Sequence, residues 1–314
     1  VQSVKRLDLL TVLTVCDVRS VGPDTWNNWK ATLIRQLYSE TKLTLEQGGE
    51  ALNRENRMAE AKKILRKKLS GWDPKDIKLE TGRHYPPYWQ GFQIGAQFAF
   101  AKLLKSLGAD EIKIDLTPDT DRDATRICFA LSDHPGIFSR LSGALALVGA
   151  NVVDARSYTS KDGFATAAFW VQDADGAPYD ESRFSRLRAM IEKILSGEII
   201  TRDAIKERDK FKKRERAFKV PTSITFNNEG SEIYTIIEVD TRDRPGLLFD
   251  LTRTLANMNV YIASAVIATY GEQVVDSFYV KDMFGLKFYS ESKQKKLEQN
   301  LRQAITLGVE RAQS

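Results

Sequence analysis

The chain reads Asp-His-Pro-Gly at residues 133–136, and 110 residues later it reads Asp-Arg-Pro-Gly at residues 243–246. The match continues on both sides of this turn. At the same spacing, Ile114, Thr125, Ile127, Leu141, Leu145 and Ala146 recur as Ile224, Thr235, Ile237, Leu251, Leu255 and Ala256. A later loop shifts the spacing to 109, so that Phe169 stands opposite Phe278 and Gly176 opposite Gly285. Repetition at a fixed spacing indicates two copies of one structural unit.

Each copy has the same order of expected elements: strand, strand, helix, strand, strand, helix. Alternating apolar residues indicate the strands, and apolar residues every three or four positions indicate the helices. The expected strands are 112–116, 127–131, 152–158 and 165–171 in the first copy, and 224–226, 233–239, 260–268 and 274–280 in the second. The expected helices are 137–148 and 184–194, then 247–258 and 297–305.

These elements predict an α+β fold with four parts. Residues 1–105 form a helical region, 110–200 the first copy, 201–219 a basic helical linker and 220–314 the second copy. The second copy leaves no room for a strand after its last helix, so the strand that precedes each copy must complete its sheet. We therefore expect two antiparallel four-stranded sheets, each with two helices on one face.

The helical region carries three further expectations. The apolar run at residues 9–15 is too continuous for a surface helix and predicts a segment buried against a larger body. Asp73-Pro74 is typical of a helix start. Residues 82–89 read Gly-Arg-His-Tyr-Pro-Pro-Tyr-Trp, which predicts a turn whose prolines bar a helix and whose aromatic rings pack against neighbouring helices.

Composition restricts the classes of protein that need to be considered. The apolar content of 42% and the charged content of 28% are ordinary for a globular protein, and no apolar run is long enough to span a membrane. Cys16 and Cys128 lie in apolar runs and are expected to be reduced core thiols of a cytoplasmic protein. The basic run at 206–219 has few interleaved aromatic residues, so no nucleic-acid partner is expected.

The repeated turn can be interpreted in two ways. Asp133 and Asp243 stand where helix N-caps belong, and capping alone would explain them. Gly136 and Gly246, placed inside the first helical turn, favour a second interpretation. They leave backbone N–H groups uncovered at the positive end of a helix dipole, where a carboxylate binds well. With Asp133 and Asn151 available for an ammonium group, the turn suits a free amino acid.

The repeat resembles the ACT domain, an amino-acid-sensing module of metabolic enzymes. The resemblance implies a ligand between paired modules, touching the turn before the first helix and the start of the next strand. It assigns Asp133, His134, Gly136, Asn151 and Val152 in the first copy, and Asp243, Arg244, Gly246, Tyr261 and Ile262 in the second. Tyr261 replaces the amide of Asn151, which predicts unequal binding by the two copies. His134 is equally well read as an exposed turn residue.

Stretches outside the repeats extend the resemblance to the whole chain. Residues 10–23, 26–30 and 83–89, followed by the two ACT-like copies, resemble the C-terminal part of the bifunctional family that adds UMP to the signalling protein PII and removes it. The resemblance implies glutamine as effector, PII as partner and a cytoplasmic location. It also implies a divalent metal such as Mg²⁺ in a phosphohydrolase domain of the HD type, of which the helical region is the end.

Of that metal site, the resemblance places only one ligand in this chain, Asp17. The alternative for Asp17 is a polar residue paired with Arg19 or Lys30. The chain has no nucleotidyltransferase signature, and its only histidines are His84 and His134. We therefore expect it to catalyse neither reaction alone. A second hypothesis treats the two copies as interaction modules without ligand, which dock PII or mediate self-association.

Overall fold

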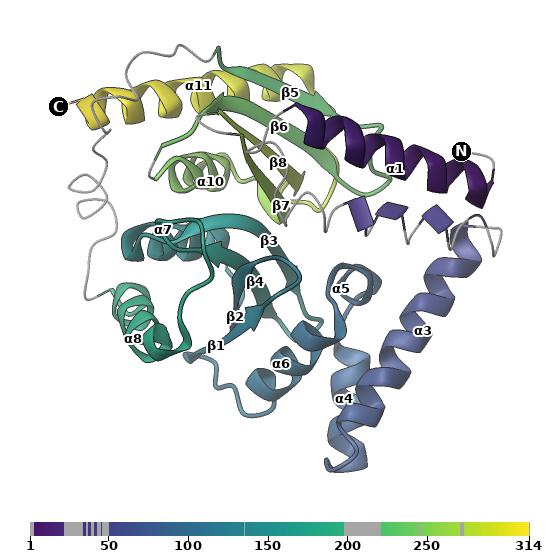
Figure 1. Cartoon of the computed structure of the whole chain (residues 1–314). Helices are drawn as coiled ribbons and strands as arrows, with labels where there is room; N and C mark the ends of the chain where they lie inside the picture. Colours follow the sequence, from purple (N-terminus) through teal and green to yellow (C-terminus); the bar gives the residue numbers. More distant parts are fainter. Residues whose placement is uncertain are drawn as a thin grey trace.

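The computed structural model describes residues 3–21, 34–35, 37–38, 41–42, 45, 50–134, 136–197, 221–244, 246–270 and 273–313. The predicted linker at 201–219 and the turn prolines Pro135 and Pro245 lie outside these residues. The helical region contains α1 (Val4–Ser20), α3 (Glu50–Lys68), α4 (Pro74–Arg83), α5 (Pro86–Gly91) and α6 (Ile94–Leu104). Figure 1 shows these helices beside the two repeated copies.

Both copies contain the predicted elements in the predicted order. The first comprises β1 (Ile112–Asp119), β2 (Ala124–Ser132), α7 (Ile137–Val148), β3 (Asn151–Thr159), β4 (Phe164–Gln172), the short 3-10 helix η2 (Glu181–Arg183) and α8 (Phe184–Leu195). The second comprises β5 (Ser223–Asn227), β6 (Thr235–Arg242), α10 (Leu247–Asn257), β7 (Tyr261–Tyr270), β8 (Gln273–Lys281) and α11 (Glu291–Gln313). The α+β fold class is thus confirmed.

The two four-stranded sheets join into one antiparallel sheet of eight strands, in the order β1-β2-β4-β3-β7-β8-β6-β5. The join is made by β3 and β7, where Ala155 pairs with Ala265, its own counterpart in the repeat. Nearby, the hydroxyl groups of Ser142 and Thr252, another pair of counterparts, lie 3.0 Å apart between α7 and α10. Contacts between equivalent residues mark a two-fold axis. The copies are therefore related by a pseudo-two-fold axis within one chain.

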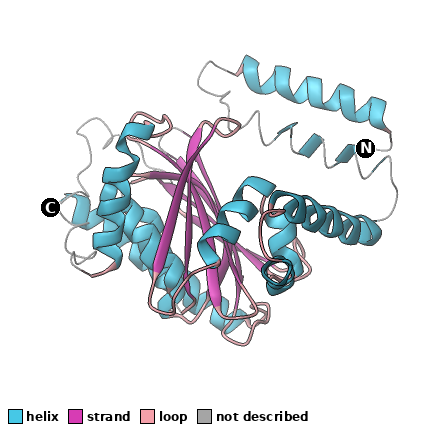
Figure 2. Cartoon of the chain, turned by 90° about the horizontal axis from the view of Figure 1, so that it is seen from below, coloured by secondary structure: helices cyan, strands magenta, loops and turns pink. Residues whose placement is uncertain are grey.

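The four helices of the repeats lie on one face of this sheet (Figure 2). Strand residues alternate between the two faces. Ile127, Phe129 and Leu131 of β2 point into the core under α7 and α8, together with Ile237 and Val239 of the second copy. Their neighbours Cys128 and Ala130 point to the opposite face. The sequence pattern thus places one continuous core between the sheet and its four helices.

The helical region covers the opposite face of the first copy. Tyr88, Phe92 and Phe100 pack there with Trp170 of β4 in a second core. This packing confirms the prediction for the aromatic rings of residues 82–89, but the prediction that prolines bar a helix there is wrong. Helix α5 begins at Pro86, with both prolines at its first positions. The first-turn N–H groups have no partner within a helix, so proline costs nothing there.

Other expectations for the helical region had mixed outcomes. Asp73 caps α4 by accepting a hydrogen bond from Lys75 N, at 2.8 Å, as predicted. Four apolar residues of α1, Leu9, Leu10, Val12 and Leu13, are each at least half accessible, whereas Leu7 is buried. The expected burial of this segment against a larger body stays a prediction. Cys128 of β2 is buried, whereas Cys16 of α1 is exposed, so only Cys128 is a core thiol. No helix among the described residues is long and apolar enough to cross a membrane.

The hairpin between β3 and β4 ties the first copy to the helical region. Lys161 N donates to the carbonyl oxygen of Arg83, at 2.8 Å, and the Arg83 guanidinium forms an ion pair with Asp162, at 3.0 Å. Arg83 also pairs with the buried carboxylate of Glu80. Near the end of β3, the side chain of Tyr158 packs against the backbone of Gly91. These contacts fix the hairpin against α4 and α5.

Replacing Gly91 by alanine should therefore loosen this junction. A Cβ atom at Gly91 would overlap the Tyr158 hydroxyl and ring. Because Tyr158 is confined among Tyr88 and Phe92, we expect a loss of about 1–3 kcal/mol in the free energy of unfolding. Urea unfolding measures it. In the matched control Gly82→Ala nothing lies within 4 Å of the new Cβ, so this helical substitution should stabilise the chain by about 0.5–1 kcal/mol. Equal effects of the two variants would contradict the packing described.

Candidate ligand cavities between the two copies

The repeated turn makes the start of each copy's first helix. Gly136 and Gly246 are the N-cap residues of α7 and α10, with φ angles of 83° and 75°. The prediction that Asp133 and Asp243 are N-caps, with the glycines inside the first turn, is therefore wrong. The chain leaves the strand and enters the helix through a left-handed residue, a conformation that glycine adopts without strain. The aspartate lies three residues earlier, and its side chain is available for other contacts.

Two cavities lie between the copies, and each is built from both. Cavity 1, of about 270 Å³, is lined by the turn of the second copy (Asp243, Arg244, Gly246) and by the start of β3 in the first (Asn151, Val152). Cavity 2, of about 570 Å³, is lined by the turn of the first copy (Asp133, His134, Gly136) and by the start of β7 in the second (Tyr261, Ile262). The ten predicted residues therefore all line the cavities, but the pseudo-two-fold axis groups them across the copies.

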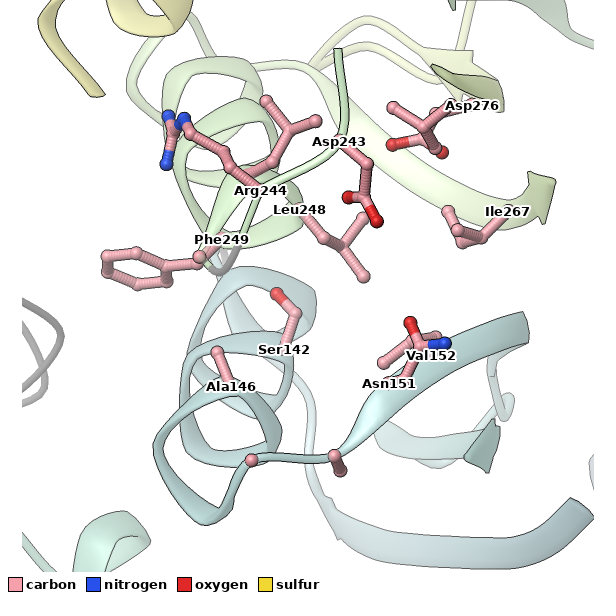
Figure 3. A pocket seen from close by; sticks show the side chains of 15 residues that line it. Ser142, Ala146, Asn151, Val152, Asp243, Arg244, Leu248, Phe249, Ile267 and Asp276 are labelled. Carbon is pink, nitrogen blue, oxygen red and sulfur yellow. The ribbon is translucent and has the colours of Figure 1, made fainter. Parts of the chain in front are cut away.

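Cavity 1 gathers its polar groups at one end. In Figure 3 the carboxylates of Asp243 and Asp276 point toward the same space, and the Asn151 side chain approaches from the first copy on the opposite side. Ser142 and Ala146 of α7, with Leu248 of α10, form a small-residue and apolar wall. The cavity thus offers two carboxyl groups and an amide beside an apolar lining.

Arg244 does not contribute its charge to this end of cavity 1. Its guanidinium is buried and donates to Asp250 Oδ2 at 2.5 Å. In Figure 3 it points away from the side chains of Asp243 and Asp276. It also packs closely against the backbone of Gly308 in α11. Arg244 therefore connects α10 with α11. The family resemblance assigned it to the ligand and gave no indication of this structural role.

Cavity 2 has a different polar end. The Thr159 hydroxyl lies 2.5 Å from Asp133 Oδ2 and 2.6 Å from the Tyr261 hydroxyl, so the three side chains form one network. Burial, together with the charge of Asp133, raises the pKa of Tyr261 to about 12, which keeps its phenol neutral at physiological pH. His134, Lys281 and Asp282 also line this cavity. At its polar end, Asp133 therefore has one carboxylate oxygen bonded to a hydroxyl group, while its Oδ1 atom has no hydrogen-bond partner among the described residues.

Both cavities abut the N-terminus of a helix. The residues after each N-cap glycine line the cavity: Leu247, Leu248 and Phe249 in cavity 1, and Ile137, Phe138 and Ser139 in cavity 2. The N–H groups of Ile137 and Leu247 donate to the carbonyl oxygens of His134 and Arg244 in the turns. The next N–H groups of each first helical turn lack intrahelical partners and lie at the positive end of the dipole. Each cavity thus combines a seat for an anion with acidic side chains that suit a cation. That combination fits a zwitterion such as a free amino acid.

Asp276 and Thr159 were not predicted from the sequence. Asp276 stands opposite Ala167 of the first copy in the repeat, on the inward face of a strand whose other inward residues, Val274, Phe278 and Val280, are apolar. A carboxylate at an inward strand position was a signal that could have been followed. Thr159 gave none, because a threonine in a strand is unremarkable.

Asp17, the predicted metal ligand, lies on the exposed side of α1. Its backbone carbonyl accepts a hydrogen bond from the Ser20 hydroxyl at 2.7 Å. Among the described residues, no group of three or more histidine, cysteine, aspartate or glutamate side chains is arranged to hold a metal ion. Since the other ligands are expected beyond this chain, the role of Asp17 stays a prediction.

The carboxyl group of Asp276 should make stability depend on pH in a defined direction. Burial, and then the neighbouring Asp243, raise its pKa well above the ordinary value. The folded chain therefore holds this proton at pH values where the unfolded chain has released it. As pH rises from about 4 through the folded pKa, this group progressively destabilises the fold. Asp276→Asn lacks the penalty, so without ligand it should be more stable than the parent at pH 7 and lose that advantage near pH 4. Urea unfolding across this range measures the difference, and a variant less stable than the parent at pH 7 would contradict it.

Comparison with known proteins supports the family resemblance. The family described as an ACR9-like, ACT-like domain matches residues 223–310, nearly the whole second copy. The bifunctional uridylyltransferase/uridylyl-removing enzymes of Ruegeria pomeroyi and Cereibacter sphaeroides are 68% and 67% identical over 99% of this chain. That of Azospirillum brasilense is 43% identical over 97%. The resemblance predicted from the sequence motifs is thereby confirmed.

The chain spans about a third of the length of these relatives, 35% of the Ruegeria enzyme and 34% of the Cereibacter enzyme. Among solved structures, an aspartate kinase from Synechocystis covers 58% of this chain, and the chain covers 27% of the kinase, with a TM-score of 0.30 and 14% identity. That likeness is too low to inform the fold, which rests on the strand pairing described above.

Proposed function

We propose that this chain, similar over nearly its whole length to part of the bifunctional uridylyltransferase/uridylyl-removing enzymes, is a regulatory region that binds glutamine between its two ACT-like copies. In the whole enzyme, the bound glutamine would shift the balance from UMP addition to UMP removal on PII, in the cytoplasm. The catalytic groups, including the divalent metal to which Asp17 would contribute, belong to the rest of that enzyme. This chain alone should catalyse neither reaction.

The observation that carries the proposal is the crosswise construction of the cavities. Each one places an acidic residue of one copy's turn and a helix N-terminus against the first strand residues of the other copy. Such a site exists only while the copies are paired, so a ligand that fills it stabilises one arrangement of the two copies. Cavity 1, at about 270 Å³, is below the roughly 300–1,000 Å³ typical of sites for drug-sized ligands, which suits a single amino acid.

The structure also supports a route by which occupancy could reach the helical region. Asp133 of cavity 2 bonds Thr159 at the end of β3, and its backbone N–H donates to Gly163 O at 2.9 Å. Both partners flank the β3–β4 hairpin, which Asp162 and Lys161 fix to Arg83 at the end of α4. A shift of the turn on ligand binding would therefore move a hairpin anchored in the helices. Coupling of this kind is commonly about 1–3 kcal/mol.

Isothermal titration of the chain with L-glutamine tests the proposal. We expect saturable binding, and no binding by a chain shown to be folded by its far-UV circular dichroism would refute it. The alternative is ligand-free interaction modules. The β3 and β7 edges are already paired with each other, so edge-to-edge contact with another molecule would have to use the outer strands β1 or β5 of the described sheet.

The N-cap glycines test whether the repeated turns form the binding site. In the double variant Gly136→Ala, Gly246→Ala, each alanine must adopt a positive φ, at a cost of about 1–2 kcal/mol per residue. The strained turns should shift the first-turn N–H groups and weaken glutamine binding at least tenfold. The pairing of the copies should stay intact, because a Cβ atom built on Gly136 would lie 3.7 Å from the Cβ atom of Ala256 of the other copy, an ordinary contact. Far-UV circular dichroism and gel filtration verify the fold. Unchanged glutamine affinity would show that the two turns do not form the binding site.

A further inference from the structure

The two cavities differ in one buried carboxyl group. Asp276 of β8 lines cavity 1 and is 1% exposed, and its Oδ1 atom has no hydrogen-bond partner among the described residues. The equivalent position in the first copy is Ala167, which is fully buried and does not line cavity 2. An unpartnered buried carboxyl group is unfavourable for folding unless a partner satisfies it. Its location at a cavity points to a partner that comes from outside the chain.

The surroundings of Asp276 favour a cationic partner. The Asp243 carboxylate shares the same space, and the nearby guanidinium of Arg244 is directed away to Asp250. Asn151 adds an amide oxygen from the opposite copy. An α-ammonium group has three N–H donors and no acceptor, so it can satisfy all three of these oxygens. The side chains of Ala146 and Leu248 in the cavity wall carry no hydrogen-bond acceptor for this ammonium group.

Resting on the proposed function, we propose that Asp276, Asp243 and Asn151 form an ammonium subsite that makes cavity 1 the primary seat of a free α-amino acid. Cavity 2 is not its equivalent. There Asp133 Oδ2 accepts from Thr159, although its Oδ1 atom has no hydrogen-bond partner among the described residues. The phenol of Tyr261 stands in place of the Asn151 amide, and Ala167 stands in place of Asp276. The ligand carboxylate in cavity 1 faces the first turn of α10, formed by Leu247, Leu248 and Phe249.

Titration with two probes tests the ammonium subsite. L-glutamine is compared with glutaramic acid, which keeps the carboxylate and the side-chain amide but lacks the amino group. Loss of a charged hydrogen bond corresponds to about 1.5–3 kcal/mol, and therefore to a roughly 10-fold to 150-fold change in affinity. We expect glutaramic acid to bind at least tenfold more weakly than glutamine, and Asp276→Asn to weaken glutamine binding by a similar factor without affecting glutaramic acid.

The matched control is Asp175→Asn, an exposed aspartate that lines neither cavity. It should leave glutamine affinity within about twofold of the parent. A third variant, Asp133→Asn in cavity 2, replaces the counterpart of Asp243 and compares the two cavities. Parent-like glutamine affinity in Asp276→Asn would overturn the inference, as would a loss confined to Asp133→Asn. Near-UV circular dichroism and urea unfolding confirm that each variant is folded, and Asp276→Asn should be at least as stable as the parent at pH 7.

The same titrations separate failure of this inference from failure of the proposed function. If the parent binds another amino acid but not glutamine, sensing of glutamine fails and the three variants are compared with that amino acid instead. If the folded parent binds none of the twenty common amino acids, the proposed function and the ammonium subsite both fail. If it binds glutamine and all variants bind equally, only the subsite fails.

Discussion

Replacing Ser142 by arginine is expected to lower the free energy of unfolding by about 4 kcal/mol and to abolish glutamine binding. Ser142 is 2% exposed, and its hydroxyl bonds Phe138 O at 2.9 Å and meets the Thr252 hydroxyl at 3.0 Å on the pseudo-two-fold axis. An arginine there would bury an unpaired charge between α7 and α10, a mechanism that produces the largest single-residue losses. Because both cavities are built across this axis, separating the helices removes both.

Urea unfolding and titration with L-glutamine measure these two effects. The control is Ser185→Arg on the exposed surface of α8, which should change stability by no more than about 0.5 kcal/mol and leave binding unaltered. Ser142→Ala removes only one hydroxyl and should lose about 1 kcal/mol. A Ser142→Arg variant with parent-like stability and affinity would show that the two copies do not pack about this axis.

Replacing Phe278 by alanine is expected to destabilise the chain by about 3–5 kcal/mol. Phe278 is fully buried on the inward face of β8, and its counterpart Phe169 occupies the same place in the first copy. Phe169→Ala should lose a similar amount, since its ring meets Phe129 and Phe138 at centroid distances of 5.8 and 5.1 Å. Both aromatic side chains belong to one core. The empty space left by truncating either ring therefore weakens the whole eight-stranded sheet.

Chemical unfolding of the two variants measures this prediction, with Met283→Ala as the control. Met283 is 67% exposed, so its truncation should have little effect. If one phenylalanine variant lost several kcal/mol and the other almost none, the copies would not share a continuous core. Two separate unfolding transitions in the parent would point to the same conclusion.

Much of the fold was predictable because local patterns carry it. Alternation in β2, as in Ile127, Phe129 and Leu131, and helical spacing in α7 both follow from burial on one face. The joining of the two sheets was not predictable. Ala155 and Ala265 look like any small buried strand residue, and only the three-dimensional pairing shows that each meets its counterpart.

The site was predicted by residue but not by grouping. The ligand was expected between paired modules, but its contacts were grouped by copy, whereas the pseudo-two-fold axis brings Asn151 to Asp243 and Tyr261 to Asp133. The N-cap assignment failed because an aspartate before a helix usually caps it, and the left-handed glycine that follows takes that position here. Asp276 was missed because its counterpart in the first copy, Ala167, is not polar, so the repeat drew no attention to this position.

The most direct measurement of the central claim is a crystal structure of the chain grown with saturating L-glutamine. We expect glutamine in cavity 1, with its amino group against Asp243 and Asp276 and its carboxylate at the first turn of α10. Two empty cavities in a chain that is otherwise folded as described, or glutamine bound away from the junction of the two copies, would contradict the account.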